Sequence, residues 1–297
     1  MLSRSQRIML EMGLIHQSAK GHTPCIYRHD LVALHQRNLT SRLSLPMNKV
    51  PEKFIPKKLA LTTRVIETKG CLRCCVSRNP YNGYRYLCVA IPSGIILFQW
   101  YEPLSKFMLL KQTECRIPEP LNVLEMIITP ENEYPLVCIG VRKSADRRQI
   151  VYDLVNLNTG ANWFSTHDEN KDMDILEVTA LRQLEKDVIL ICYNNVVQLT
   201  NLQGKLKSSR MSTAELRFPF HIDKIVCLTD SILAFHRHGL QGRSFLNGQV
   251  TQDICDNTRS YSLLGSDSVV VLESKPRNEA SSSSNLYILT GHESSIP

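Results

Sequence analysis

The stretch DVILICYNNVVQLTNLQGK, from Asp187 to Lys205, holds two short apolar runs separated by a pair of asparagines. Val, Ile, Leu and Tyr dominate both runs, and polar residues or glycine bound them, which is the composition of β-strands. Asparagine accepts positive φ, so Asn194 and Asn195 suit the tight turn of a hairpin. Residues 230–248, DSILAFHRHGLQGRSFLNG, repeat this pattern. The chain therefore predicts a series of hairpins.

The hairpins recur at a regular spacing along the second two-thirds of the chain. The centres of their first strong strands lie 49, 53, 43 and 38 residues apart, at Leu87, Leu136, Ile189, Ile232 and Val270. Units of about 40–50 residues with several strands each are typical of β-propeller blades, whereas an immunoglobulin-like array would repeat every ~100 residues. A helical spacing of apolar residues is weak and confined to residues 175–184. The sequence predicts an all-β protein with a propeller architecture.

Composition narrows the class of protein. The chain has 297 residues, 43% hydrophobic content and a net charge of +7, enough to bury a sizeable core. Lys and Arg are spread along the chain, which argues against a nucleic-acid-binding module and leaves an acidic protein or an anionic membrane surface as partners. Ten cysteines lie mostly inside apolar runs, such as Cys88, Cys138, Cys192 and Cys227. This placement predicts reduced thiols packed in the core of a cytoplasmic protein.

The chain divides into a lead and a main domain. Residues 1–58 form a weakly patterned lead and a linker punctuated by Pro and Lys, compatible with a helix or with part of an early blade. Residues 59–297 hold the predicted propeller domain. The first 17 residues lack the apolar segment of a secretory signal, and no apolar run approaches the ~20 residues of a membrane span.

Residues 68–91, TKGCLRCCVSRNPYNGYRYLCVAI, identify a family. They resemble the citron homology domain of the MAP kinase kinase kinase kinases, the germinal-centre-kinase branch of the sterile-20-like kinases, and most closely the germinal-centre-kinase-like kinase group. The likeness continues through NLQGKLKSSR (201–210), IVCLTDSILAFHRHGLQGRSF (225–245) and NLYILTGHE (285–293). It covers the chain from about Leu59 to Glu293.

The resemblance implies a seven-bladed propeller that serves as a regulatory, protein-binding module behind a kinase domain. The chain departs from that plan in two ways. It lacks the kinase motifs V-A-I-K, H-R-D and D-F-G. It also has room for only about five blades after Leu59, so we expect an N-terminally truncated and incomplete propeller.

Three groups of residues are candidates for a site. The motif C-x-x-C-C at Cys71, Cys74 and Cys75 lacks the second pair that a zinc site needs, and a redox C-x-x-C belongs in a βαβ unit, so packing is favoured. His236 and His238 would share one face of a strand, as a metal pair requires, but no third ligand has a suitable spacing, and a hairpin turn with solvent-facing histidines is favoured. No catalytic, cofactor or metal residue is assigned.

The third group is basic. The candidates for contacts with acidic partners are Arg142, Lys143, Arg147, Arg148, Lys205, Lys207 and Arg210. Lys205 and Lys207 follow a strand and would share a face. The alternative interpretation, solvated loops that keep the protein soluble, is favoured about two to one.

These observations leave three hypotheses for function. The first is a non-catalytic regulatory domain that, by its resemblance, binds small GTPases or adaptors in stress-activated MAP kinase (JNK) signalling. The second is a fragment of an active serine/threonine kinase, whose own kinase domain would then be a partner. The third is a membrane-tethering adaptor, since citron-type domains also occur in exchange factors and vesicle-tethering proteins.

Overall fold

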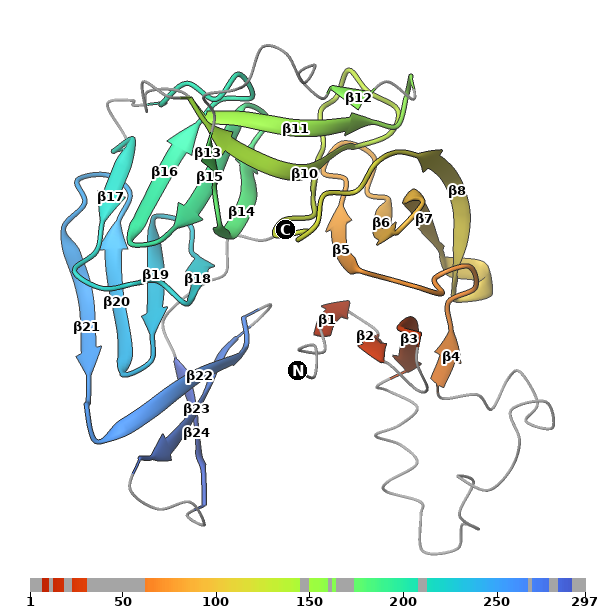
Figure 1. Cartoon of the computed structure of the whole chain (residues 1–297). Helices are drawn as coiled ribbons and strands as arrows, with labels where there is room; N and C mark the ends of the chain where they lie inside the picture. The colour runs from red at the N-terminus through yellow and green to blue at the C-terminus, as the bar shows by residue number, and fades with distance from the viewer. Residues whose placement is uncertain are drawn as a thin grey trace, which may run out of the picture. The chain divides into compact units, whose positions relative to one another are not determined.

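The protein is described by a computed structural model that covers residues 7–10, 13–18, 23–30, 62–144, 150–159, 162–163, 174–207, 213–266, 269–277 and 283–289 (Figure 1). The chain splits into two compact units. The first comprises residues 1–77 and 84–117, and the second comprises residues 78–83 and 118–297.

The first unit holds two four-stranded antiparallel sheets. One has the strand order β1-β2-β3-β4: β1 (Arg7–Leu10), β2 (Gly13–Ser18), β3 (Cys25–Asp30) and β4 (Thr62–Arg64). The other has the order β5-β6-β7-β8: β5 (Arg73–Arg78), β6 (Arg85–Ile91), β7 (Gly94–Tyr101) and β8 (Lys106–Glu114). A 3-10 helix (Glu102–Leu104) joins β7 to β8.

The second unit holds four further sheets. The first of them is built from β9 (Glu125–Ile127), β10 (Leu136–Lys143), β11 (Ile150–Asn156), β12 (Asn162–Trp163) and β13 (Asp174–Ile175). The next contains β14 (Val178–Glu185), β15 (Val188–Tyr193), β16 (Val196–Thr200) and β17 (Glu215–Arg217). The third contains β18 (Lys224–Cys227), β19 (Ser231–His236), β20 (Gly239–Ser244) and β21 (Val250–Cys255). The last contains β22 (Arg259–Gly265), β23 (Val270–Pro276) and β24 (Asn285–Leu289).

The predicted repeat is confirmed. The five anchor residues lie in β6, β10, β15, β19 and β23, which are the second strands in chain order of five successive sheets. The hairpin at Asn194 and Asn195 is also confirmed, because β15 and β16 pair up to Tyr193↔Val196 and Asn194 has a φ of 50°. Most of residues 175–184, which carry the weak helical spacing, lie in the strand β14 (Val178–Glu185).

The described part of the N-terminal lead forms strands and not the helix that was one interpretation of its sequence. Residues 7–30 contribute β1, β2 and β3, which pair with β4 to give a sheet in addition to the five that the spacing predicts. The short runs RIML and GLIHQS, each four to six residues long, are easier to pair as strands than to propagate as a helix.

Apolar layers pack the sheets of the second unit against one another. In β15, Ile189 and Ile191 face a core cluster shared with β10 and β11, while Leu190 and Cys192 face a cluster shared with β18 and β19. A strand that is buried on both faces needs a continuous apolar run, which explains the sequence VILICY. Each such Ile or Leu stabilises the fold by about 2 kcal/mol when fully buried.

Most cysteines are buried, as predicted. Cys88, Cys138, Cys192 and Cys227 are all buried, and all ten cysteines are free thiols. Among the residues that the structure describes, no helix is long and apolar enough to span a membrane.

Candidate interaction surface

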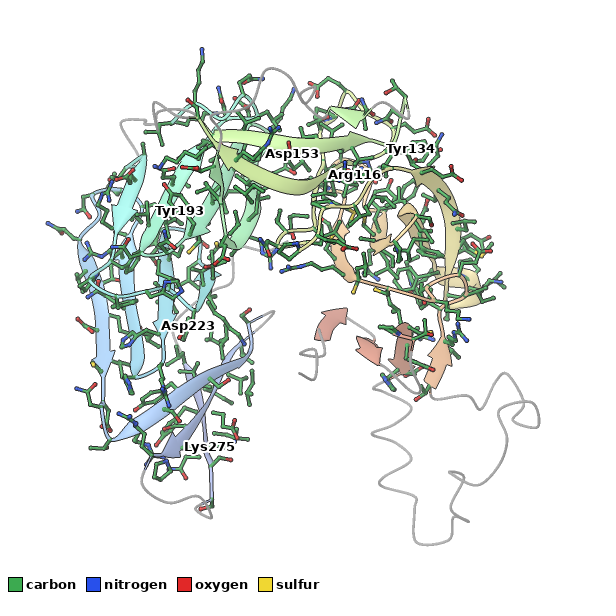
Figure 2. The ribbon with its side chains drawn as sticks, viewed as in Figure 1. Arg116, Tyr134, Asp153, Tyr193, Asp223 and Lys275 are labelled. Carbon is green, nitrogen blue, oxygen red and sulfur yellow. The ribbon has the colours of Figure 1, made fainter. Side chains whose placement is uncertain are left out.

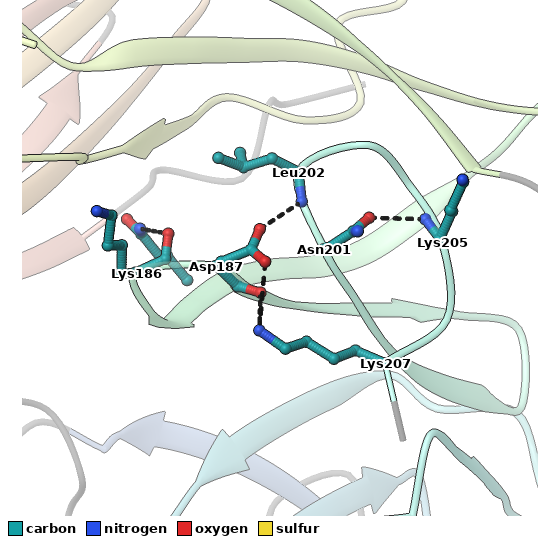
Figure 3. A network of polar contacts seen from close by, with 7 residues as sticks. Lys186, Asp187, Asn201, Leu202, Lys205 and Lys207 are labelled. Atoms are coloured by element: carbon teal, nitrogen blue, oxygen red, sulfur yellow. Dashed lines mark hydrogen bonds and ion pairs between the residues drawn. The ribbon is translucent and has the colours of Figure 1, made fainter. Parts of the chain in front are cut away.

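The lysines predicted to contact partners after β16 lie in a tight turn of the second unit (Figure 3). The side chain of Asn201 accepts a hydrogen bond from the backbone N–H of Lys205 at 2.9 Å, and the Gly204 N–H donates to the Asn201 carbonyl at 2.9 Å. Gly204 has a φ of +73°, and a Cβ at that position would clash with the carbonyl oxygen of Ile150. The turn is therefore pressed against β11 and positioned rigidly.

Lys207 is held within the protein. Its Nζ donates to the carbonyl oxygen of Asp187 at 2.8 Å and lies 3.3 Å from the Asp187 carboxylate (Figure 3). The same carboxylate accepts the N–H of Leu202 at 3.2 Å. Asp187 thus ties the β14–β15 turn to the connection after β16. Lys205 is exposed, and none of the ion pairs among the described residues includes it.

Arg142 and Lys143, at the end of β10, also make internal contacts. Arg142 forms an ion pair with Asp153 on the neighbouring strand β11, with Nη2 2.6 Å from Oδ1. The Lys143 ammonium donates to the hydroxyl of Tyr193 at 2.9 Å and lies 5.1 Å from the centroid of that ring. Asp153 and Tyr193 are labelled in Figure 2. The other three basic candidates, Arg147, Arg148 and Arg210, lie outside the described residues.

The second unit also carries an exposed aromatic residue that the sequence analysis did not predict as a site residue. Tyr81 lies in the turn between β5 and β6, where the Asn79 side chain accepts its N–H at 2.9 Å, and 49% of its surface is exposed. The Tyr81 phenol has a minor electrostatic effect on Lys186, whose ammonium forms an ion pair with Glu131. The hydrogen bond with Glu131 is the main cause that raises the pKa of Lys186, and the Tyr81 phenol adds to it. The motif N-P-Y-N-G, a turn signature that carries a tyrosine, was the available signal.

We call this group the turn cluster. It consists of Tyr81, Glu131, Lys186, Asp187, Lys205 and Lys207. Lys186 and Asp187 are adjacent in the β14–β15 turn, and Asp187 links that turn to the β16–β17 connection. Chemically it offers an aromatic ring and ammonium groups on a framework fixed by backbone hydrogen bonds.

The cysteine motif forms part of the core. Cys71 and Cys74 are both fully buried and pack with Ile26, Leu87 and Ile96. The hydrogen bond with Cys74, followed by burial, raises the pKa of Cys71 well above its usual value, so its thiol is neutral. No group of three or more His, Cys, Asp or Glu side chains among the described residues could hold a metal ion.

Two interpretations were open for His236 and His238, a metal pair on one strand face and a hairpin turn. The strand β19 ends at His236, and His238 lies in the turn before β20, so the two do not alternate along one strand. The hairpin-turn interpretation is confirmed, but the side chains are half-buried instead of facing solvent. The His236 ring stacks on Phe220 with centroids 4.2 Å apart, and Nδ1 of His238 is 3.0 Å from the carbonyl oxygen of Arg259.

Comparison with known proteins gives one family. The sequence model of the CNH domain matches residues 11–265. The chain is 47% identical over 282 residues to mitogen-activated protein kinase kinase kinase kinase 3 of Rattus norvegicus, covering 94% of this chain and 32% of that protein. It is 46% identical to the protein of the same name from Homo sapiens, again over 94% of this chain and 31% of that protein. The chain therefore spans about a third of the length of these relatives.

A solved structure supports the fold. The AfRom2 CNH domain superimposes with a TM-score of 0.56 and 11% sequence identity, covering 96% of this chain and 79% of that chain. The antiparallel sheets described above thus have the predicted all-β, β-propeller fold.

Proposed function

Because the chain belongs to the CNH domain family, we propose that it is a regulatory module that acts by binding other proteins. Its proposed partners are small GTPases or signalling adaptors in stress-activated MAP kinase (JNK) signalling. The similarity to MAP kinase kinase kinase kinase 3 along 94% of the chain supports this pathway. The proposed location is the cytoplasm, in line with ten free thiols and the reducing conditions that such thiols require.

The turn cluster is the observation that carries the proposal. Tyr81 and Lys205 are both exposed, and each lies in a turn closed by an asparagine side chain. Tyrosine is among the residue types that contribute most binding energy at interfaces, and lysines steer acidic surfaces towards their target. A rigid framework lowers the entropic cost of binding, since these side chains are presented by fixed backbone. An acidic protein surface fits this arrangement.

Capture of purified small GTPases by the immobilised chain tests the proposal. We expect GTP-loaded protein to be retained better than GDP-loaded protein, and Tyr81→Ala and Lys205→Glu to reduce that retention. Lys69→Glu makes the same charge change at an exposed lysine of the first unit and serves as the control. Retention that does not depend on the bound nucleotide would argue against this partner. An equal loss of retention in the Lys69 variant would argue against this surface.

A second candidate function rests on the names of the relatives. They are protein kinases, and this chain matches only about a third of their length. In a longer protein, the domain would regulate a kinase domain of the same polypeptide. Sequencing the transcript upstream of Met1 tests this candidate. An in-frame H-R-D and D-F-G pair would support it, and an in-frame stop codon would contradict it.

Membrane tethering is the third candidate, supported by the net charge of +7. Pelleting with vesicles of increasing phosphatidylserine content tests it, because electrostatic attraction to anionic lipid grows with surface charge. Binding that does not change with lipid charge would remove this candidate.

A further inference from the structure

The turn between β19 and β20 connects two neighbouring sheets of the second unit. We call residues 236–238 the histidine turn. The carbonyl oxygen of Arg237 accepts the backbone N–H of Tyr261 at 2.9 Å, and the carbonyl oxygen of His238 accepts the backbone N–H of Asp256 at 2.9 Å. Both donors belong to the segment that leads from β21 into β22. The histidine turn therefore helps to hold the start of β22 in place.

The side chain of His238 adds a third contact to the same segment. Its Nδ1 lies 3.0 Å from the carbonyl oxygen of Arg259. A carbonyl oxygen accepts hydrogen bonds and does not donate them, so this nitrogen carries a hydrogen whether the ring is neutral or charged. The side chain of Arg259 in turn donates to the hydroxyl of Ser274 on β23 at 2.6 Å. Protonation of His238 therefore leaves this contact intact.

His236 makes the opposite kind of contact. Its Nδ1 accepts the backbone N–H of His238 at 3.3 Å, so this nitrogen must have a free lone pair. A neutral imidazole has one donor and one acceptor nitrogen, whereas an imidazolium has two donors. A proton added to the His236 ring would occupy the lone pair and turn two N–H groups towards each other. The hydrogen bond inside the turn would then be lost at the residue whose carbonyl oxygen holds Asp256.

The surroundings of His236 favour its neutral form. The ring stacks on Phe220, with centroids 4.2 Å apart. Burial is the main cause that lowers the pKa of His236, followed by the nearby His238. Asp223, just before β18, and Asp253, on β21, oppose this shift but do not cancel it. The closed turn therefore binds a proton less readily than an open one does.

We propose that the histidine turn is a pH-sensitive contact between two sheets, in which protonation of His236 opens the turn and releases the start of β22. The released segment is residues 256–261 and not the whole sheet, because Val270 and Leu272 of β23 still pack against β18, β19 and β20. The contact is fully formed above the unfolded histidine value of ~6.5. It weakens as the pH falls below that value, since the open turn binds the proton better.

Hydrogen–deuterium exchange of the whole chain at pH 7.5 and pH 5.0 tests the proposal. Protection is measured relative to the unfolded chain at the same pH, which removes the intrinsic effect of pH on exchange. We expect residues 256–261 to lose protection at least about fivefold, since pH 5.0 lies ~1.5 units below the unfolded histidine value. Residues 188–200, in β15 and β16, should keep their protection. The lower pH stays above the usual carboxylate value of ~4, so Asp223 and Asp253 remain charged.

Two asparagine variants separate the roles of the two histidines. His236→Asn offers a side-chain oxygen that accepts a hydrogen bond and does not titrate, so residues 256–261 should stay protected at both pH values. His238→Asn removes the other imidazole, keeps an N–H donor, and should respond to pH as the native protein does. A response in His236→Asn equal to the native one would overturn the proposal. Unchanged protection in the native protein, or an equal loss in residues 188–200 that reports global unfolding, would overturn it as well.

Discussion

The guanidinium of Arg142 on β10 reaches diagonally to the carboxylate of Asp153 on the neighbouring strand β11, with Nη2 2.6 Å and Nε 3.1 Å from the same oxygen. Their side chains are only 15% and 16% exposed, so neither charge is well solvated. A basic residue that looks available in the sequence is thus occupied with holding β10 and β11 in register. The Arg142–Asp153 ion pair leads to the first prediction.

Arg142→Ala should lower the free energy of unfolding by about 2 kcal/mol, because Asp153 is left half-buried without its charged partner. Urea denaturation at neutral pH measures the change. Arg217→Ala is the control: its ion pair with Glu215 is local and its side chain is 68% exposed, so the expected cost is below about 0.5 kcal/mol. Equal effects of the two changes would contradict a stabilising role for the Arg142 pair.

Gly204→Ala should destabilise the protein more than Gly83→Ala does. Both glycines have positive φ, +73° and +75°. A side chain at either position would cost about 1 kcal/mol in backbone strain. At Gly204 the new Cβ would also clash with the backbone of Ile150, whereas nothing lies within 4 Å at Gly83. We expect a difference of at least about 2 kcal/mol in urea denaturation, in line with the cost of overpacking. A similar loss at both sites would mean that the turn after β16 can move away from β11.

Alkylation at pH 8 should label one cysteine much faster than the others. Cys255 is exposed, while burial raises the pKa of Cys192 to about 12 and that of Cys227 to about 11. Since the thiolate is the reactive form, the buried thiols should react only on unfolding. Mass spectrometry of iodoacetamide-treated protein counts the adducts, and Cys255→Ser should remove the fast one. Rapid labelling of Cys192 in native protein would contradict the packing of β15.

Stability should fall as the pH drops below about 6.5, in part through His236. Burial, and then the nearby His238, lowers the pKa of His236 in the folded protein, although Asp223 and Asp253 oppose this shift. The unfolded state therefore binds a proton more readily, so the destabilisation begins as pH falls through the unfolded value of ~6.5 and is complete below the folded pKa. Above the unfolded value His236 contributes no pH dependence.

Urea denaturation of the native protein and of His236→Gln at pH 7.5 and pH 5.0 measures this contribution. The variant should lose less stability between the two values than the native protein does. His221→Gln, which removes an exposed imidazole of the same unit, is the matched control variant. A pH dependence that is identical in the native protein and in His236→Gln would show that this ring titrates alike in both states.

Much of the fold could be predicted from the sequence. The strand β15 is marked by VILICY, its turn by two asparagines, and its place in the repeat by the distance to Leu136 and Ile232. These signals are local, since strand pairing across a two-residue turn involves neighbours in the chain. The segment of residues 7–30 gave no such signal, and its strands became recognisable only through their pairing with one another and with β4.

The candidate site was harder to predict. Sequence identified Lys205 and Lys207 as basic, but the structure shows that Asp187 holds the second of them and that a turn pressed on Ile150 positions the first. Lys143 contacts Tyr193, fifty residues further along the chain. The repeat of about 40–50 residues relates the strands of successive sheets but does not say which side chains meet, so the partners of a charged side chain cannot be predicted from its own segment.

The order of residues alone determined that this is a CNH-type chain of repeated antiparallel hairpins, because alternation along a strand and the residues of a tight turn act over a few positions. Which charges remain on the surface for a partner was decided only by the tertiary structure. Folding brings Lys143 against Tyr193 and Arg28 against Trp100 from distant segments. Whether a charged side chain contacts its own protein or remains available to a partner depends on which residues the fold brings close to it.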